Sequence, residues 1–111
     1  MVKMYLDTST MTAKLGLDEK EYEWAGGREM AEGLHKFIFE KLKENGADWK
    51  DISQITFFSG PGSFTGLRIG AAIVNTLAKE LNVPLFDHKG EKHEIIIPEY
   101  GRPANVTEQK K

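Results

Sequence analysis

The segment SGPGSFTGLRIG, residues 59–70, constrains the fold of this chain more than any other stretch. It holds four of the 11 glycines and joins an apolar run at 52–58 to residues 64–81. The run predicts a β-strand, and the apolar residues of 64–81 recur at helical spacing. Gly60-Pro61-Gly62 turns the chain sharply, and Ser63 is placed to cap the helix. The sequence therefore predicts a strand, a tight turn and a helix in direct succession.

This glycine loop is compatible with an anion site, because free backbone N–H groups at the start of a helix attract phosphate. The spacing of Gly60, Gly62 and Gly66 is GxGxxxG, whereas a dinucleotide fold needs GxGxxG. The GK[ST] ending of a P-loop is absent, and Ser63 directly follows Gly62, so it is not in a GxSxG nucleophile elbow. Two interpretations stay open: a phosphate-binding loop, or a purely structural turn between strand and helix.

The rest of the chain predicts a mixed sheet. Alternating or apolar runs at 4–7, 11–17 and 21–25 predict three consecutive antiparallel strands. Residues 28–45 predict a helix that Gly46 ends, and 83–87 predict a fifth strand. A chain of 111 residues supports one core, so we expect a single α/β sandwich with a five-stranded mixed sheet in the order βββαβαβ. After residue 88 we expect a turn at 89–92, an edge strand at 94–97 and an extended tail from Pro98.

Small residues on the second predicted helix need an explanation. Gly66 and Gly70 lie four apart, and each costs roughly 1 kcal/mol relative to alanine inside a helix. Close packing of another element would offset that cost: the protein's own sheet, its first helix, or the helix of a partner. Phe39 lies outside the main apolar stripe of the first helix, which favours an intermolecular helix bundle. The predicted interface consists of Met30, Leu34, Phe37, Ile38, Gly66, Gly70, Ile73, Val74 and Leu77.

Composition excludes several classes of protein. The net charge of −2 does not suit a nucleic-acid polycation, and the absence of cysteine excludes disulfides and thiolate zinc sites. No apolar run approaches the ~20 residues that span a bilayer, and the first residues do not resemble a signal peptide. We therefore expect a cytoplasmic protein.

Polar clusters give weak signals. Asp7-Thr8-Ser9-Thr10 follows the first strand, where it is either a capped turn or a contact for phosphate or metal. His88 and His93, with Asp87 and Glu94 nearby, have no recognised ligand spacing, so no metal site is expected. No nucleophile has an obvious partner, which argues against a hydrolase.

Three stretches make the chain recognisable: DTST at 7–10, REMAEGLHKFIFEKL at 28–42 and above all SGPGSFTGLRIG at 59–70. Together they resemble the N-terminal domain of the TsaB (YeaZ) family over roughly residues 3–88. PEYGRP at 98–103 is similar to the PxYxRP sequence near that family's C-terminus, whereas Met30 stands where the family often has histidine. The resemblance divides the chain into an N-terminal domain at 1–88 and a tail at 89–111.

The resemblance implies one actin-like lobe (ASKHA, ribonuclease H-like) in a non-catalytic subunit. Such a subunit pairs with a TsaD-type paralogue to make N6-threonylcarbamoyladenosine (t6A) at position 37 of tRNA. It uses its two N-terminal helices, it forms a homodimer when alone, a TsaE-type ATPase is a further partner, and tRNA is contacted only indirectly. A free-standing homodimeric module is the alternative.

The resemblance also bears on cofactors. Actin-like proteins hold nucleotide between two lobes, and the sequence has room for one, so we expect no cofactor. The strand-end loops are then a vestigial phosphate site formed by Asp7, Thr8, Ser9, Gly60, Gly62 and Ser63.

Overall fold

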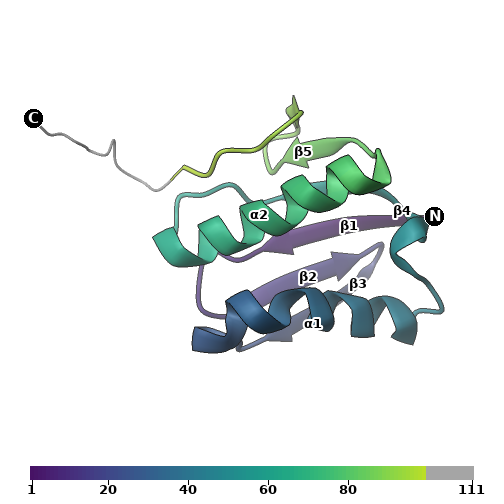
Figure 1. Cartoon of the computed structure of the whole chain (residues 1–111), viewed down its shortest axis with the longest axis horizontal. Coiled ribbons are helices and arrows are strands. Elements are labelled where there is room, and N and C mark those ends of the chain that lie inside the picture. Colours follow the sequence, from purple (N-terminus) through teal and green to yellow (C-terminus); the bar gives the residue numbers. More distant parts are fainter. Residues whose placement is uncertain (100–111) are drawn as a thin grey trace, which may run out of the picture.

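The sheet is built around its first strand. The structure, a computed structural model, describes residues 1–99, and β1 (Val2–Asp7) is central in it (Figure 1). On one side β1 pairs antiparallel with β2 (Ala13–Leu17), which pairs antiparallel with β3 (Lys20–Trp24). On the other side β1 pairs in parallel with β4 (Ile52–Phe57), which pairs in parallel with β5 (Leu85–Asp87). The last strand, β6 (Lys92–His93), is antiparallel to β5, so the sheet order is β3-β2-β1-β4-β5-β6.

Both helices lie on the same face of the sheet (Figure 1). A 3₁₀ turn (Gly27–Glu29) leads into α1 (Met30–Glu44), which packs over β2 and against α2. A second 3₁₀ turn (Trp49–Asp51) precedes β4, and α2 (Phe64–Leu81) then crosses β4, β1 and β5. Each crossover returns the chain to a parallel strand, as α/β connections do.

The core lies between the sheet and the two helices. Strand residues alternate, so Met4, Leu6, Ile55 and Phe57 are buried under the helices. On the opposite face no element among residues 1–99 covers the sheet (Figure 1). β1 and β2 carry Lys3, Tyr5 and Lys14 on that face, and these side chains are exposed. This one-sided burial explains why these strands alternate between apolar and polar residues.

The ends of the helices follow the predicted signals. Ser63 Oγ accepts a hydrogen bond of 3.2 Å from the backbone N–H of Gly66, which confirms its role as the cap of α2. Gly46 has φ +70°, the left-handed conformation that favours glycine just after a helix, and Ala47 N–H returns to Leu42 C=O at 2.9 Å. The two helix positions were therefore predictable from local chemistry.

The prediction of five strands is corrected to six, although the order βββαβαβ of the first seven elements is confirmed. The edge strand expected at 94–97 is wrong, because β6 occupies residues 92–93 and the chain then runs beside α2. Asn75 fixes that path: its side chain donates to Ile96 C=O at 3.0 Å and accepts from Ile96 N–H at 2.8 Å. Most of the PEYGRP stretch lies outside the described residues. Within residues 1–99, neither helix is long and apolar enough to cross a lipid bilayer.

Candidate functional site

The six residues of the predicted phosphate site come together at one edge of the sheet. Because β1 and β4 are parallel, their carboxyl ends meet, and the loops 7–10 and 59–63 lie against each other. Ser63 N–H donates to Ser9 C=O at 2.8 Å, and Gly62 packs so closely on Ser9 that an added Cβ would lie 2.5 Å from Ser9 Cβ. This is the edge at which α/β sheets bind ligands.

Much of the polar chemistry at this edge is used within the protein. Thr8 is fully buried, and its hydroxyl donates to Gly66 C=O at 2.6 Å. Asp7 Oδ1 accepts from Ser9 N–H at 2.8 Å, while Ser63 Oγ holds Gly66 N–H. The N–H groups of Ser9, Ser63 and Gly66 are therefore unavailable to an anion. The vestigial phosphate site and the absence of nucleotide binding stay predictions.

Gly66 and Gly70 face the protein's own sheet, which corrects the prediction that they form a groove for a partner. A Cβ on Gly66 would collide with Thr8 C=O, and one on Gly70 with the Thr8 hydroxyl. The same Cβ on Gly70 would lie 2.6 Å from Cε1 of Phe57. The two glycines thus let α2 approach β1 and β4 closely.

Most apolar residues of the predicted interface also point inward. Buried in the core are Met30, Leu34, Phe37, Ile38 and Val74. They stabilise the helix–sheet contact and are not accessible to a partner. Phe39, whose apolar surface favoured an intermolecular bundle, stacks on Trp49 with ring centroids 5.8 Å apart, so its contact is intramolecular.

Ile73 and Leu77 remain at the surface, half-buried, and Ile69 extends their line along α2. Beside them, Arg68, Ala72 and Thr76 form an exposed row. Phe64, at the start of the helix, is 55% exposed, with the Arg68 guanidinium 5.6 Å from its ring centroid. We call this surface, residues 64–77 on the outer side of α2, the α2 face. From Phe64 to Leu77 it carries one charge, Arg68.

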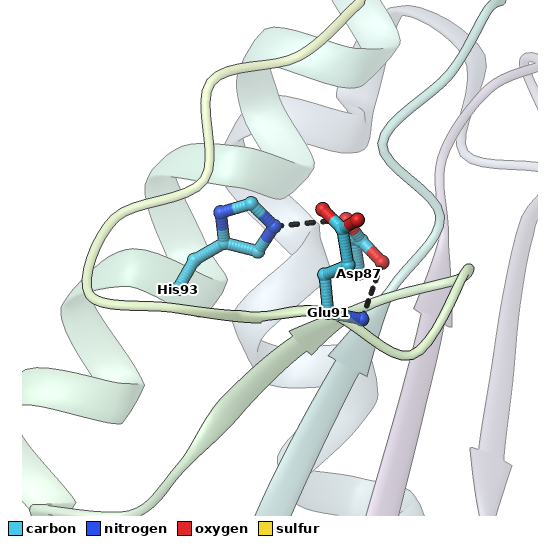
Figure 2. Close-up of side chains that lie close together, drawn as sticks. All are labelled: Asp87, Glu91 and His93. Carbon is cyan, nitrogen blue, oxygen red and sulfur yellow. Dashed lines mark hydrogen bonds and ion pairs between the residues drawn. The ribbon is translucent and has the colours of Figure 1, made fainter.

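A second polar cluster lies where β5 turns into β6. Figure 2 shows His93 pointing across the hairpin at the carboxylate of Asp87, with Glu91 beside it. His93 Nε2 and Asp87 Oδ2 share a hydrogen bond of 2.8 Å, and Asp87 Oδ1 accepts from the N–H groups of Lys89 and Glu91 at 2.9 and 3.0 Å. The sequence placed Asp87 and Glu94 near the two histidines but did not predict the Asp87–His93 pair, because the register of the hairpin cannot be read from spacing.

The hydrogen bonds of this cluster stabilise the β5–β6 hairpin. One ligand atom each from Asp87, Glu91 and His93 lies within 4.8 Å of the others, a separation that a metal ion tolerates. However, both oxygens of Asp87 already accept hydrogen bonds that hold the turn. The hydrogen bond from His93 lowers the pKa of Asp87 from its usual 3.8 to about 2, which keeps the carboxylate charged.

His88 lies at the same strand-end edge as the glycine loop. Its Nδ1 accepts from Ser59 N–H at 3.2 Å and lies 3.4 Å from Ser59 Oγ, and its ring packs on Phe58 with centroids 4.4 Å apart. Since Nδ1 faces both the backbone N–H and the hydroxyl of Ser59, His88 anchors the loop after β4.

The amino-acid sequence of this chain is similar to those of known proteins. Residues 24–87, which contain both helices, match the family model "TsaD: tRNA N6-adenosine threonylcarbamoyltransferase". The chain is 34% identical over 88 residues to the tRNA threonylcarbamoyladenosine biosynthesis protein TsaB of Haemophilus influenzae, which covers 72% of this chain and 36% of that protein. It is also 33% identical over 76 residues to the tRNA N6-adenosine threonylcarbamoyltransferase of Christiangramia forsetii, covering 62% of this chain and 22% of the transferase.

The fold leads to the same group of proteins. The solved structure of YeaZ from Pseudomonas aeruginosa matches with a TM-score of 0.70 at 30% identity, over 78% of this chain and 42% of that one. The chain thus spans less than half the length of the relatives it matches. The sheet and helices correspond to one lobe of YeaZ, an ASKHA fold. The family model matches more than half of this chain, and the chain therefore belongs to the TsaB/YeaZ family.

Proposed function

We propose that this protein is a non-catalytic scaffold subunit that pairs with a TsaD-type protein in the synthesis of t6A at position 37 of tRNA. One observation carries the proposal: the segment that holds both helices matches TsaB relatives and a threonylcarbamoyltransferase alike. Two chains that share a helical surface can pack those surfaces on each other with pseudo-twofold symmetry, as in isologous dimers. A TsaE-type ATPase is a further proposed partner, and tRNA contact is indirect.

The α2 face is the proposed docking surface. Its exposed row of Arg68, Ala72 and Thr76 is flanked by half-buried Ile69 and Ile73, so it combines two small side chains and one charge with an aliphatic ridge. Few charges need to be desolvated when such a surface is buried, and burial contributes roughly 25 cal/mol per Å² of apolar area. The proposal therefore keeps Ile73 and Leu77 from the predicted interface.

The scaffold acts by shifting the conformational population of its partner. It must bind the active conformation of the TsaD-type protein more tightly than the inactive one, because equal affinity shifts nothing. No group on this chain needs to touch the reacting atoms.

The first test is the mass of the protein in solution, by light scattering, alone and mixed with the TsaD-type protein of the same organism, followed by a t6A synthesis assay. A one-to-one complex that makes t6A when neither protein does so alone is the expected result. A homodimer that ignores the partner contradicts the proposal and favours the free-standing module.

A pair of matched variants tests the surface. Ala72→Arg places a charge in the exposed row of the α2 face, whereas Ala25→Arg makes the same change at an exposed site beyond β3. Both should fold normally. Ala72→Arg should weaken the complex at least tenfold and Ala25→Arg should not; equal binding by both variants would remove the α2 face from the proposal.

A further inference from the structure

We propose that the groove between β3 and α1 binds an extended basic peptide, which adds as a strand to the free edge of the sheet. This edge groove is a hollow of about 580 Å³, and Trp24, Phe37, Glu23, Glu29, Glu32 and Glu40 line it. The groove lies at the far edge of the sheet from β6, whereas the α2 face lies over β1 and β4. The inference is therefore independent of the proposed function.

The backbone of β3 provides the first element of the site. β3 is five residues long and, among residues 1–99, pairs with β2 alone, so one side of its backbone has no strand partner. An unpaired edge of this kind is a template for an incoming strand. Added peptides gain affinity from backbone hydrogen bonds and specificity from alternate side chains.

The wall of the groove is preformed. The Trp24 ring stacks on Phe37 with centroids 5.5 Å apart and an interplanar angle of 25°. Gly33 on α1 makes room for it, since a Cβ there would lie 2.7 Å from Cη2 of Trp24. A rigid aromatic wall lowers the entropic cost of binding, because no side chain has to be ordered first.

Charge decides which peptide fits. The groove has four carboxylates, Glu23 from β3 and Glu29, Glu32 and Glu40 from the α1 side. Within the described residues none of the four lies within 4.0 Å of a basic nitrogen. Of the two lysines in the groove, Lys41 is held by Glu44 at 2.9 Å and lies over the Tyr22 ring. The other, Lys36, is exposed and offsets one of the four carboxylates. The groove therefore keeps a net negative charge, which attracts lysine or arginine.

The geometry favours basic residues at alternate positions. Side chains of an added strand point to opposite faces of the sheet. Those on the helix side meet Glu32 and Glu40, which lie two helical turns apart on one side of α1 with Lys36 between them, whereas the others face solvent beside β3. Basic residues of the peptide are therefore expected opposite the two glutamates, and a neutral residue opposite Lys36. An acidic peptide would meet repulsion from Glu32 and Glu40.

The test uses three capped octapeptides with the ¹⁵N-labelled protein: alternating lysine and threonine, alternating glutamate and threonine, and alternating lysine and proline. The lysine–proline peptide keeps the charge but has half as many amide donors for the strand edge. We expect saturable amide shifts at residues 20–24 and 29–41 with lysine–threonine. Binding should weaken with added salt and be at least tenfold weaker for both other peptides.

Two double variants give the matched control. Glu32→Gln/Glu40→Gln removes two charges from the groove, whereas Glu80→Gln/Glu94→Gln removes two from exposed sites elsewhere. The first should weaken lysine–threonine binding at least tenfold, and the second should change it less than twofold. Equal losses, equal binding of the lysine–proline peptide, or a peptide-free dimer formed through β3 would each overturn the proposal.

Discussion

Position 70 has no room for a methyl group. Gly70 packs on Phe57 and Thr8, and the Thr8 hydroxyl in turn holds Gly66 C=O at 2.6 Å, so two glycines and one buried threonine form a single contact between α2 and the sheet. In an interior packed at this density, an added methyl group displaces the side chains around it. The cost of glycine inside α2 is thus offset by a close approach within one chain.

Replacing Gly70 by alanine should destabilise the protein. Alanine gains about 1 kcal/mol of helix propensity, but overpacking against Phe57 and Thr8 costs about 1–3 kcal/mol, so we expect a net loss of up to about 2 kcal/mol. Urea unfolding measures this loss. Ala72→Leu, at an exposed site on the same helix, should stay within about 0.5 kcal/mol of the parent. If the two variants are equally stable, the close contact at Gly70 is wrong.

At the scale of an element, the start of α2 depends on one hydroxyl. Ser63 Oγ accepts from Gly66 N–H, and Ser63 N–H ties the helix to the loop after β1 through Ser9 C=O. The cap therefore sets both where the helix begins and how it sits on the sheet.

Ser63→Ala should lower the free energy of unfolding by about 1 kcal/mol, because a capping side chain contributes about that much. Thr65→Ala, at an exposed position two residues later, removes a hydroxyl that caps nothing and should be close to neutral. Thermal and urea unfolding of both variants measure the difference. A Ser63→Ala protein as stable as Thr65→Ala would contradict the cap.

The β5–β6 hairpin makes stability depend on pH. The hydrogen bond from His93 lowers the pKa of Asp87 from 3.8 to about 2, so the native state binds the proton less readily than the unfolded chain. This contribution to stability is complete above about pH 3.8 and is lost as the pH falls through about 2. Asp87→Asn should remove it.

The stability difference between the parent and Asp87→Asn should therefore be largest above pH 4 and shrink toward pH 2. Urea midpoints at several pH values measure it, with the exposed Glu80→Gln as control. A difference that does not change between pH 5 and pH 2 would show that the Asp87 carboxylate has no favourable interaction in the folded state.

For the molecule as a whole, residues 1–99 have one core that joins both helices to the first five strands. The buried side chains from β1, β2, β4, both helices and β5 form a single cluster, against which Trp24 and Trp49 pack from the two sides of α1. A domain of this size with one core is expected to unfold in one step.

Unfolding followed by tryptophan fluorescence and by far-ultraviolet circular dichroism should give the same midpoint and slope. The fluorescence reports Trp24 beside α1 and Trp49 before β4, while the dichroism reports the backbone of both helices. If the fluorescence midpoint is lower than the circular dichroism midpoint, the β3–α1 side unfolds before the rest of the protein.

The elements were predictable because their signals are local. Ser63, Gly46 and the alternation in β1 and β2 each act within a few residues, and they placed both helices and the first strands. The direction in which Gly66 and Gly70 face was not predictable, since a helix of small residues has the same sequence whether a sheet or a partner covers it. The Asp87–His93 pair was missed for a similar reason: it depends on a register that only the folded hairpin defines.

The parallel pairing of β1 with β4 also sets the order in which the parts of the sheet form during synthesis. The partner of Val2 on that side is Ile52, so about 50 residues must leave the ribosome before the central strand of the sheet has its second neighbour. At typical rates of synthesis this takes about 3–10 s, during which the nascent β1–β3 meander and α1 expose the apolar side that β4 and α2 later cover. Substitutions that slow the pairing of β4 with β1 should therefore lower the yield of folded protein in cells, even where they leave the equilibrium stability of the protein unchanged.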